Sequence, residues 1–449
     1  MKHSYRPMSL KNEFVVFKFP AQQKKQTREH DLEFVDLLIK NAHQLINPVI
    51  NDNQSSELVI IHDGAVACCE GMIIASGTTS DVINRIRIGQ NTKIIDATKK
   101  VLAPGFVDPH THPIFFGTRE NEFELRIKGK TYREIAEAGG GIRYSVRQLR
   151  GASQQQLIEH AIPFLDRFIQ HGTTTIEAKS GYGLSLLDEI KSLHAIKALN
   201  QLHSIELIPT FLGAHEIPDE YRHRRDAYIE LIIKEMIPQV AEQNLAEFCD
   251  IFCEQHVFTV PESERILTAA IDAGLKIKIH ADQLTSSGGA ELAADLHAVS
   301  ADHLDFITPE AIQKIKAAGT IPVLLPGAVF FLGMQKYAPA RQMLDAGLKV
   351  ALATDFNPGS CMTESMPIMM TLGCIYLKML PEEVWLATTL HSALAVSRAG
   401  AIGTLQPGAQ ADFVIWDIPN YKYLPYHFGV NLVDHVFKNG QSVWKHKKE

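Results

Sequence analysis

Two histidines separated by one residue, His110 and His112, close an apolar stretch that begins at residue 104. Alternate side chains of an extended chain point the same way, so both imidazoles can reach one metal ion. His280 ends the apolar run 275–280, and Asp355 directly follows the run 349–354. Imidazole and carboxylate ligands suit Zn²⁺, with iron as the alternative, whereas no cysteine cluster supports thiolate chemistry. These residues are the predicted ligands of a metal ion.

Two more histidines follow other apolar runs. His303 comes after residues 297–301, and an imidazole with a pKa near 6.5 can take a proton from water and return it to a leaving nitrogen. We therefore predict that His303, together with Asp355, is catalytic. The alternative for His303 is a core histidine that donates a hydrogen bond to a carboxylate. His215, after residues 205–210, is similarly placed and is better suited to contact a substrate.

All of these residues follow short apolar runs that alternate with longer helical patterns from residue 101 onward, which is typical of βα repeats. Eight such strands are expected, at 101–107, 173–178, 205–210, 247–252, 275–280, 297–301, 320–325 and 349–354. We predict an α/β fold, a (β/α)8 TIM barrel, in which the carboxyl ends of all strands meet at one rim. Strand counting leaves a doubly wound open sheet as the alternative.

Both ends of the chain are rich in predicted strands. Short apolar runs separated by turns occupy residues 34–100, and three more follow residue 396, the last two joined by the hairpin signal Asn439-Gly440. We expect residues 34–100 and 396–449 to form a small β-sandwich beside a barrel of residues 101–395. Residues 1–33 are polar and mixed, and we expect a loosely ordered extension there.

The composition argues against several classes of protein. A formal charge of −7, from 44 basic and 51 acidic residues, provides no basic field for nucleic acid. No apolar run approaches the roughly 20 residues of a membrane-spanning helix, and the apolar patch 14–19 lacks a signal-peptide cleavage pattern. The six cysteines, none in C-x-x-C spacing, indicate reduced thiols and a cytoplasmic location. A homodimer is expected only from the general frequency of two-fold assemblies.

From about residue 35 to the C-terminus the chain resembles the imidazolonepropionase family of the amidohydrolase superfamily. The stretches that carry the resemblance are Gly105-Phe-Val-Asp-Pro-His-Thr-His112, Gly139-Gly-Gly-Ile142, Lys179-Ser-Gly-Tyr-Gly183, Phe211-Leu-Gly-Ala-His215, His280-Ala-Asp-Gln283 and Thr354-Asp-Phe-Asn-Pro-Gly359. The resemblance implies a hydrolase of histidine degradation that acts on a carbon–nitrogen bond of a cyclic amide. Its substrate would be 4-imidazolone-5-propanoate, its product N-formimidoyl-L-glutamate and its nucleophile a metal-activated water.

The resemblance also implies roles for individual residues. His110, His112, His280 and Asp355 match metal ligands. Residues matching substrate contacts are Arg119, Tyr182 and His215, and residues matching product contacts are Tyr182, Asn357, Gly359 and Ser360. A guanidinium suits the propionate carboxylate, although the alternative for Arg119 is a surface ion pair with Glu120 or Glu122.

Residues 283 and 179 restrict the type of reaction and the number of metal ions that we expect. Gln283 stands where some relatives carry glutamate; its amide can contact substrate but cannot serve as a general base, which counts against deamination. Lys179 follows the second strand, the wrong place for a carboxylated lysine that bridges two metals, so one Zn²⁺ or Fe³⁺ per subunit is favoured. The remaining alternatives are another mononuclear cyclic amidohydrolase or aminohydrolase acting on a small nitrogen heterocycle, and a non-catalytic barrel protein.

Overall fold

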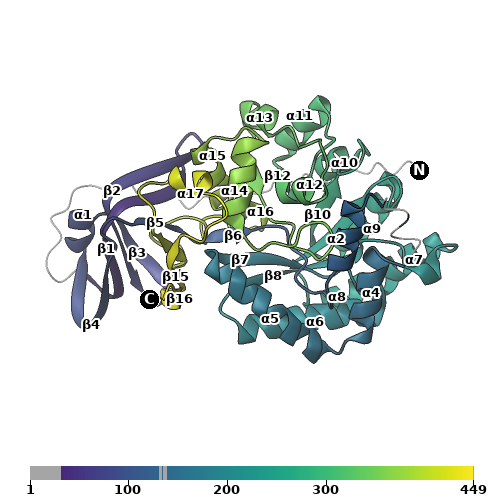
Figure 1. The fold of residues 1–449 in the computed structure, drawn as a ribbon, viewed down its shortest axis with the longest axis horizontal. Coiled ribbons are helices and arrows are strands. Elements are labelled where there is room, and N and C mark those ends of the chain that lie inside the picture. The colour runs from purple at the N-terminus through teal and green to yellow at the C-terminus, as the bar shows by residue number, and fades with distance from the viewer. Residues whose placement is uncertain (1–31, 131–133, 135–138, 448–449) are drawn as a thin grey trace, which may run out of the picture.

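A computed structural model describes residues 32–130, 134 and 139–447. It places a barrel beside a smaller β domain at one end of the molecule (Figure 1). The extension predicted for residues 1–33 lies outside the described residues except for the last two, and Glu33 already begins the first strand.

Eight parallel strands form the barrel sheet. In spatial order they are β13 (Ala351–Leu352), β12 (Ile321–Leu324), β11 (Ser300–His303), β10 (Lys276–Ala281), β9 (Phe248–Cys253), β8 (Glu206–Ala214), β7 (Thr173–Lys179) and β6 (Phe106–Asp108). Beyond the ends of β6 and β13 the sheet closes on itself, since His112 N donates to Phe356 O at 2.9 Å. Thr354 Oγ1 also donates to Asp108 Oδ2 at 2.6 Å. The predicted TIM barrel is confirmed, and the open sheet is wrong.

Helices cover the outside of the barrel (Figure 1). They are α2 (Glu120–Ile127), α4 (Ile142–Gly151), α5 (Gln154–Gln170), α6 (Leu186–Leu202), α7 (Arg225–Leu231), α8 (Ile237–Glu242), α9 (Val260–Asp272), α10 (Gly289–Asp295), α11 (Pro309–Ala318), α12 (Pro326–Phe331), α13 (Ala340–Asp345), α14 (Met366–Ile375), α15 (Pro381–Ala387) and α16 (Leu390–Ala395). Helix α5 shows how the sequence specifies the start and the buried face of such a helix. A capping box of Ser153 and Gln156 starts it, and Leu157, Ala161 and Leu165, at helical spacing, are buried.

The predicted first strand, 101–107, is divided between two sheets. Residues Val101–Pro104 form β5, which pairs with strands of the β domain, and only Phe106–Asp108 belong to the barrel. Gly105 lies between them, where a β-carbon would overlap the side chain of Thr174. Only glycine allows this close approach. Gly105 is also the residue at which the chain crosses from the β domain to the barrel.

The β domain combines both ends of the chain, as predicted. Its strands are β1 (Glu33–Ile50), β2 (Ser56–Cys69), β3 (Met72–Thr78), β4 (Ile86–Asp96), β5, β14 (Phe413–Trp416), β15 (Val433–Lys438) and β16 (Gln441–Lys445), with the short helices α1 (Thr79–Ile83) and α17 (Tyr423–Tyr426) nearby in sequence. Hydrogen bonds join all eight strands in one sheet, because the long β1 pairs with β4 along its first half and with β5 along its second. Leu37, Leu102 and Phe413, from different parts of the sheet, share one buried cluster.

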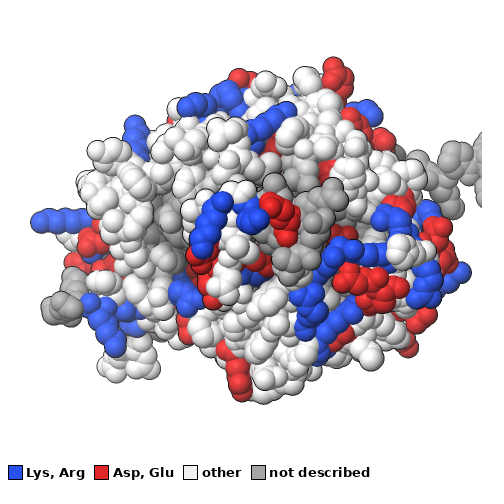
Figure 2. Space-filling view, turned by 45° about the vertical axis from the view of Figure 1, so that its right-hand side comes forward, with Lys and Arg blue, Asp and Glu red and all other residues white. Residues whose placement is uncertain are grey.

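The surface carries mixed charge, and acidic and basic side chains are interspersed on the face in Figure 2. Within the described residues, no helix has both the length and the apolar character needed to cross a membrane.

Candidate active site

The four predicted metal ligands come together at the carboxyl ends of the barrel strands. His110 Nε2 lies 3.2 Å from His112 Nε2, and each of these atoms lies 3.6 Å from Asp355 Oδ1. The ring centroid of His280 is 4.4 Å from that of His110. All four side chains are buried. The barrel therefore brings together residues that are up to 245 positions apart in the sequence, 110 to 355.

His303 completes the cluster of imidazoles. Its ring centroid lies 5.3 Å from that of His280 and 5.4 Å from that of His110. Both His303 and Asp355 have positive φ, 76° and 55°. This backbone region is unfavourable for residues other than glycine and recurs at functional sites. The positive φ turns the chain at His303, the last residue of β11, and at Asp355, shortly after β13. At both places the side chain enters the cluster.

A layer of buried charged residues lies beneath the histidines. His110 Nδ1 donates to Asp302 Oδ2 at 2.6 Å, and His280 Nδ1 lies 2.9 Å from Asp250 Oδ2. A carboxylate at Nδ1 holds the proton on that nitrogen and leaves Nε2 free as a ligand. The carboxylate of Asp302 thus selects the tautomer and orients the ring of His110, and the carboxylate of Asp250 lies beside Nδ1 of His280.

Two fully buried lysines balance these carboxylates. Lys179 Nζ lies 2.6 Å from Asp250 and 2.9 Å from Glu177, and Lys278 Nζ lies 2.6 Å from the same glutamate. Burial lowers the pKa of Lys179, but the carboxylates around it outweigh burial and raise the pKa above its ordinary value. Lys179 is therefore a paired ammonium group.

The electrostatics suit a cation. Burial and the neighbouring positive groups lower the pKa of His110, His112 and His303 well below the usual value, so these rings are neutral. Burial raises the pKa of Asp355 to about 7, against the opposing effect of His280. With Nδ1 of His110 protonated, its Nε2 presents a lone pair toward His112, whose own buried Nδ1 has no hydrogen-bond partner among the described residues. Converging lone pairs and a carboxylate fit a metal ion such as Zn²⁺.

Two predicted substrate residues lie on one side of this cluster. The ring centroid of Tyr182 is 6.1 Å from that of His112 and 5.4 Å from that of His215. His215 stacks on His112, with ring centroids 5.2 Å apart, and its Nδ1 donates to Gly181 O at 2.9 Å. Burial lowers the pKa of His215 to about 4. His215 is therefore a neutral imidazole with a defined tautomer, suited to hydrogen bonding.

Arg119 precedes α2 and forms the ion pair with Glu122 that was considered from the sequence. Its guanidinium forms an ion pair with Glu122 at 2.6 Å, and a β-carbon at Gly359 would overlap Arg119 Nη1. The ion pair is mostly buried, with 12% and 13% of the two side chains exposed. Glu122 thus holds the arginine at the rim, beside the loop that follows Asp355.

The predicted product residues form a tight turn next to Asp355. Asn357 Oδ1 accepts hydrogen bonds from the backbone N–H groups of Gly359 and Ser360, both at 2.8 Å. Ser360 Oγ donates to Asp355 Oδ2 at 3.0 Å. Ser360 therefore orients the carboxylate of Asp355, and Gly359 lies beside the guanidinium of Arg119. Gln283 is partly buried just after β10, and its role stays a prediction.

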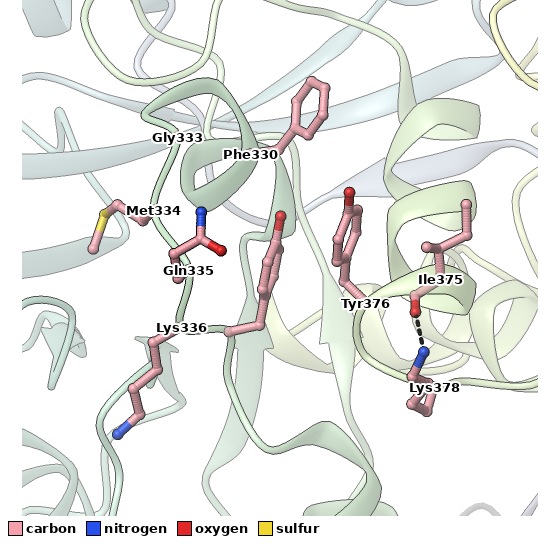
Figure 3. A pocket seen from close by; sticks show the side chains of 9 residues that line it. Phe330, Gly333, Met334, Gln335, Lys336, Ile375, Tyr376 and Lys378 are labelled. Atoms are coloured by element: carbon pink, nitrogen blue, oxygen red, sulfur yellow. Dashed lines mark hydrogen bonds between the residues drawn. The ribbon is translucent and has the colours of Figure 1, made fainter. Parts of the chain in front are cut away.

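A separate surface cavity of about 700 Å³ opens between the segment after α12 and the end of α14 (Figure 3). Its lining includes Phe330, Met334, Lys336 and Tyr376, and Tyr337 stacks on Tyr376 with ring centroids 4.6 Å apart. No predicted site residue lines this cavity. It is distinct from the histidine cluster.

Several features of the site were not foreseen from the sequence. They are Asp302, Asp250, Glu177 and Lys278 beneath the histidines. One signal was present: Lys278 interrupts the apolar strand 275–280, and a charged residue inside a buried strand requires a partner.

A TIM barrel with histidines and an aspartate at its strand ends defines a class of metal-dependent hydrolases, and the comparisons agree. The model of the amidohydrolase family matches residues 101–443. Imidazolonepropionase of Alkaliphilus metalliredigens is 46% identical over 414 residues, covering 91% of this chain and 98% of that protein. Imidazolonepropionase of Shouchella clausii is 48% identical, covering 91% and 92%. The chain belongs to the amidohydrolase family and, within it, to the imidazolonepropionases.

Solved structures of lower identity show the same fold. An adenosine deaminase from Xanthomonas campestris with bound zinc has a TM-score of 0.66 at 18% identity, covering 92% of this chain and 93% of that one. A 5-methylcytosine deaminase from Klebsiella pneumoniae has a TM-score of 0.69 at 16% identity, covering 92% and 99%.

Proposed function

We propose that this chain hydrolyses the ring amide of 4-imidazolone-5-propanoate to N-formimidoyl-L-glutamate, with one Zn²⁺ or Fe³⁺ held by His110, His112, His280 and Asp355. The observation that carries the proposal is the convergence of His110, His112 and Asp355 within 3.6 Å in a chain of the imidazolonepropionase family. Three imidazoles and a carboxylate accept either metal.

The metal, when bound, would act as a Lewis acid on the ring carbonyl and would acidify the attacking water. Asp355, itself one of the proposed ligands, and His303, whose ring lies beside those of His110 and His280, would receive the proton of that water. In the part of the chain that the structure describes, the buried Nδ1 of His303 has no hydrogen-bond partner, so this nitrogen is available to accept a proton and to return it to the leaving ring nitrogen. Gln283 has an amide and takes no part in proton transfer.

Arg119 is suited to bind the propionate carboxylate, because a guanidinium offers paired N–H donors. Tyr182, His215 and Gln283 would contact the imidazolone ring, since hydroxyl, imidazole and amide groups match its polar edges. Asn357, Gly359 and Ser360, with Tyr182, would hold the glutamate part of the product. The proximity of Arg119 to Gly359 supports one carboxylate site that serves both substrate and product.

The direct test is an assay with enzymatically generated 4-imidazolone-5-propanoate. We expect its ultraviolet absorbance to fall in the presence of the metal-loaded protein, and the product to be N-formimidoylglutamate. Loss of activity on chelation and its recovery with Zn²⁺ or iron would identify the metal. Absence of turnover by protein holding one equivalent of metal would refute the proposal and favour another nitrogen heterocycle as substrate.

We also propose a cytoplasmic location and a homodimer. The first is supported by all six cysteines being free thiols, and the second by the general frequency of two-fold assemblies. Light scattering of the purified protein tests the dimer.

A further inference from the structure

Glu189 is a buried carboxylate in the first turn of α6 that no step above uses. Its side chain is fully buried. It accepts hydrogen bonds from three backbone N–H groups, those of Gly181 at 3.0 Å, Gly183 at 2.8 Å and Leu184 at 2.8 Å. Glu189 therefore reaches back from the helix to the loop 180–184, which joins the end of β7 to α6.

This loop has little conformational freedom of its own. Gly181 has a φ of 108°, and a β-carbon at Gly183 would lie 2.6 Å from the backbone of Asp188. Its N–H groups converge on the two carboxylate oxygens of Glu189. Burial raises the pKa of Glu189, and these hydrogen bonds act in the opposite direction by stabilising the charged form. Without the side chain of Glu189, three buried N–H groups would lose their acceptor, and an amide in its place would keep only one acceptor oxygen.

The same loop carries two groups that face the metal cluster. Tyr182 stands at its centre, 3% exposed, next to His112 and His215. The carbonyl of Gly181 accepts from His215 Nδ1 at 2.9 Å and so selects the tautomer of that ring. Ser180 Oγ accepts from Leu212 N at 2.9 Å, which ties the loop to β8.

We infer that Glu189 is a positioning residue for substrate binding, because it holds the loop 180–184 in the one conformation that places Tyr182 and the Gly181 carbonyl beside the cluster. The inference rests on the proposed function, in which Tyr182 and His215 contact the substrate. The competing explanation is that Glu189 only stabilises the start of α6. In that case its loss lowers stability but leaves the contribution of Tyr182 to binding intact.

Double-mutant kinetics separate these explanations. The variants are Glu189→Gln, which keeps the shape and removes the charge, Tyr182→Phe, and the two combined, all as metal-loaded protein with 4-imidazolone-5-propanoate. Loss of one hydrogen bond to the substrate lowers kcat/KM by about tenfold. We expect each single variant to show about this loss, mainly through KM, with metal content unchanged. The double variant should be close to the poorer single variant, because the two residues act as one unit.

The matched control is Asp188→Asn, in the same helical turn. Asp188 bonds Ser185 Oγ at 2.6 Å and Lys191 Nζ at 2.8 Å instead of the loop amides, so its replacement should leave kcat/KM within about twofold. A double variant that loses the product of the two single effects, about a hundredfold, would overturn the inference. Wild-type kinetics for Glu189→Gln with a lowered Tm would also overturn it.

Hydrogen exchange gives a readout that does not require turnover. Glu189→Gln should speed exchange of the amides of Gly181, Gly183 and Leu184, and Asp188→Asn should not. Unchanged exchange in Glu189→Gln would refute the inference, whereas a wild-type protein without turnover would refute the proposed function. If Glu189→Gln does not fold, Ser180→Ala, which removes a hydroxyl hydrogen-bonded to Glu189, replaces it with the same expected outcomes.

Discussion

Replacing Asp302 with asparagine tests whether the buried layer beneath the histidines sets their affinity for a metal ion. Asp302 Oδ2 accepts from His110 Nδ1 at 2.6 Å, Oδ1 accepts from Ser300 Oγ at 2.6 Å, and the side chain is fully buried. Asparagine keeps the shape and an acceptor oxygen. It removes the negative charge that favours the form of His110 with its proton on Nδ1 and its Nε2 free.

The size of the effect follows from these contacts. A hydrogen bond to a charged group contributes about 1.5–3 kcal/mol and a neutral one about 0.5–1.5 kcal/mol. The difference, about 1–2 kcal/mol, corresponds to roughly a five- to thirtyfold loss of affinity. The ammonium groups of Lys179 and Lys278 lie 3.8 and 3.9 Å from Asp302. With one counter-charge removed they repel a bound cation more strongly, so the upper part of this range is expected.

The assay is competition for Zn²⁺ between the protein and a chromophoric chelator at constant pH. Asp412→Asn is the control, because Asp412 is also buried and pairs with Lys438 at 2.6 Å, but belongs to the β domain. We expect both variants to have a lower free energy of unfolding and only Asp302→Asn to have a lower affinity for Zn²⁺. Equal Zn²⁺ affinities for Asp302→Asn and the wild type would refute the reasoning.

Three further outcomes are expected. His303→Ala should lower kcat by about 10²-fold with metal retained, the usual contribution of a proton-transfer residue; a near-wild-type rate would exclude that role. Arg119→Ala should raise KM for 4-imidazolone-5-propanoate at least tenfold through loss of a charged hydrogen bond, and an unchanged KM would contradict the carboxylate site. Burial lowers the pKa of His391 in the folded protein to about 4, whereas the unfolded chain has a pKa of about 6.5. The unfolded chain therefore binds a proton first as the pH falls, and the free energy of unfolding decreases between about pH 6.5 and about pH 4. The loss should reach about 3 kcal/mol in unfolding measurements and should be smaller in His391→Gln.

Placement of the candidate metal ligands at strand ends could be predicted because it depends on the local pattern of residues. An apolar run followed by a polar ligand is visible at His110, His280 and Asp355 without any knowledge of the fold. Once strands alternate with helices, the barrel brings the ends of those runs to one rim. The hairpin at Asn439-Gly440 is local in the same way, and β15 and β16 pair there with Lys438 opposite Gln441.

Other features depend on which strands become neighbours. The division of residues 101–107 into β5 and β6 follows from pairing with β14 on one side and β7 on the other. A linear pattern of apolar residues does not encode that choice, because both halves of the segment are equally apolar and buried.

The amino-acid sequence by itself determined the candidate ligand types, their positions at strand ends and the barrel that joins them, because each depends on residue type and short-range periodicity. Only the tertiary structure decided that Asp302 orients His110 and that Lys179 is held by carboxylates from other strands. It also decided that Glu189 holds the loop of Tyr182. Hydrogen bonds and ion pairs act over a few ångströms, so these partners are defined only when the chain has folded and packed distant residues together.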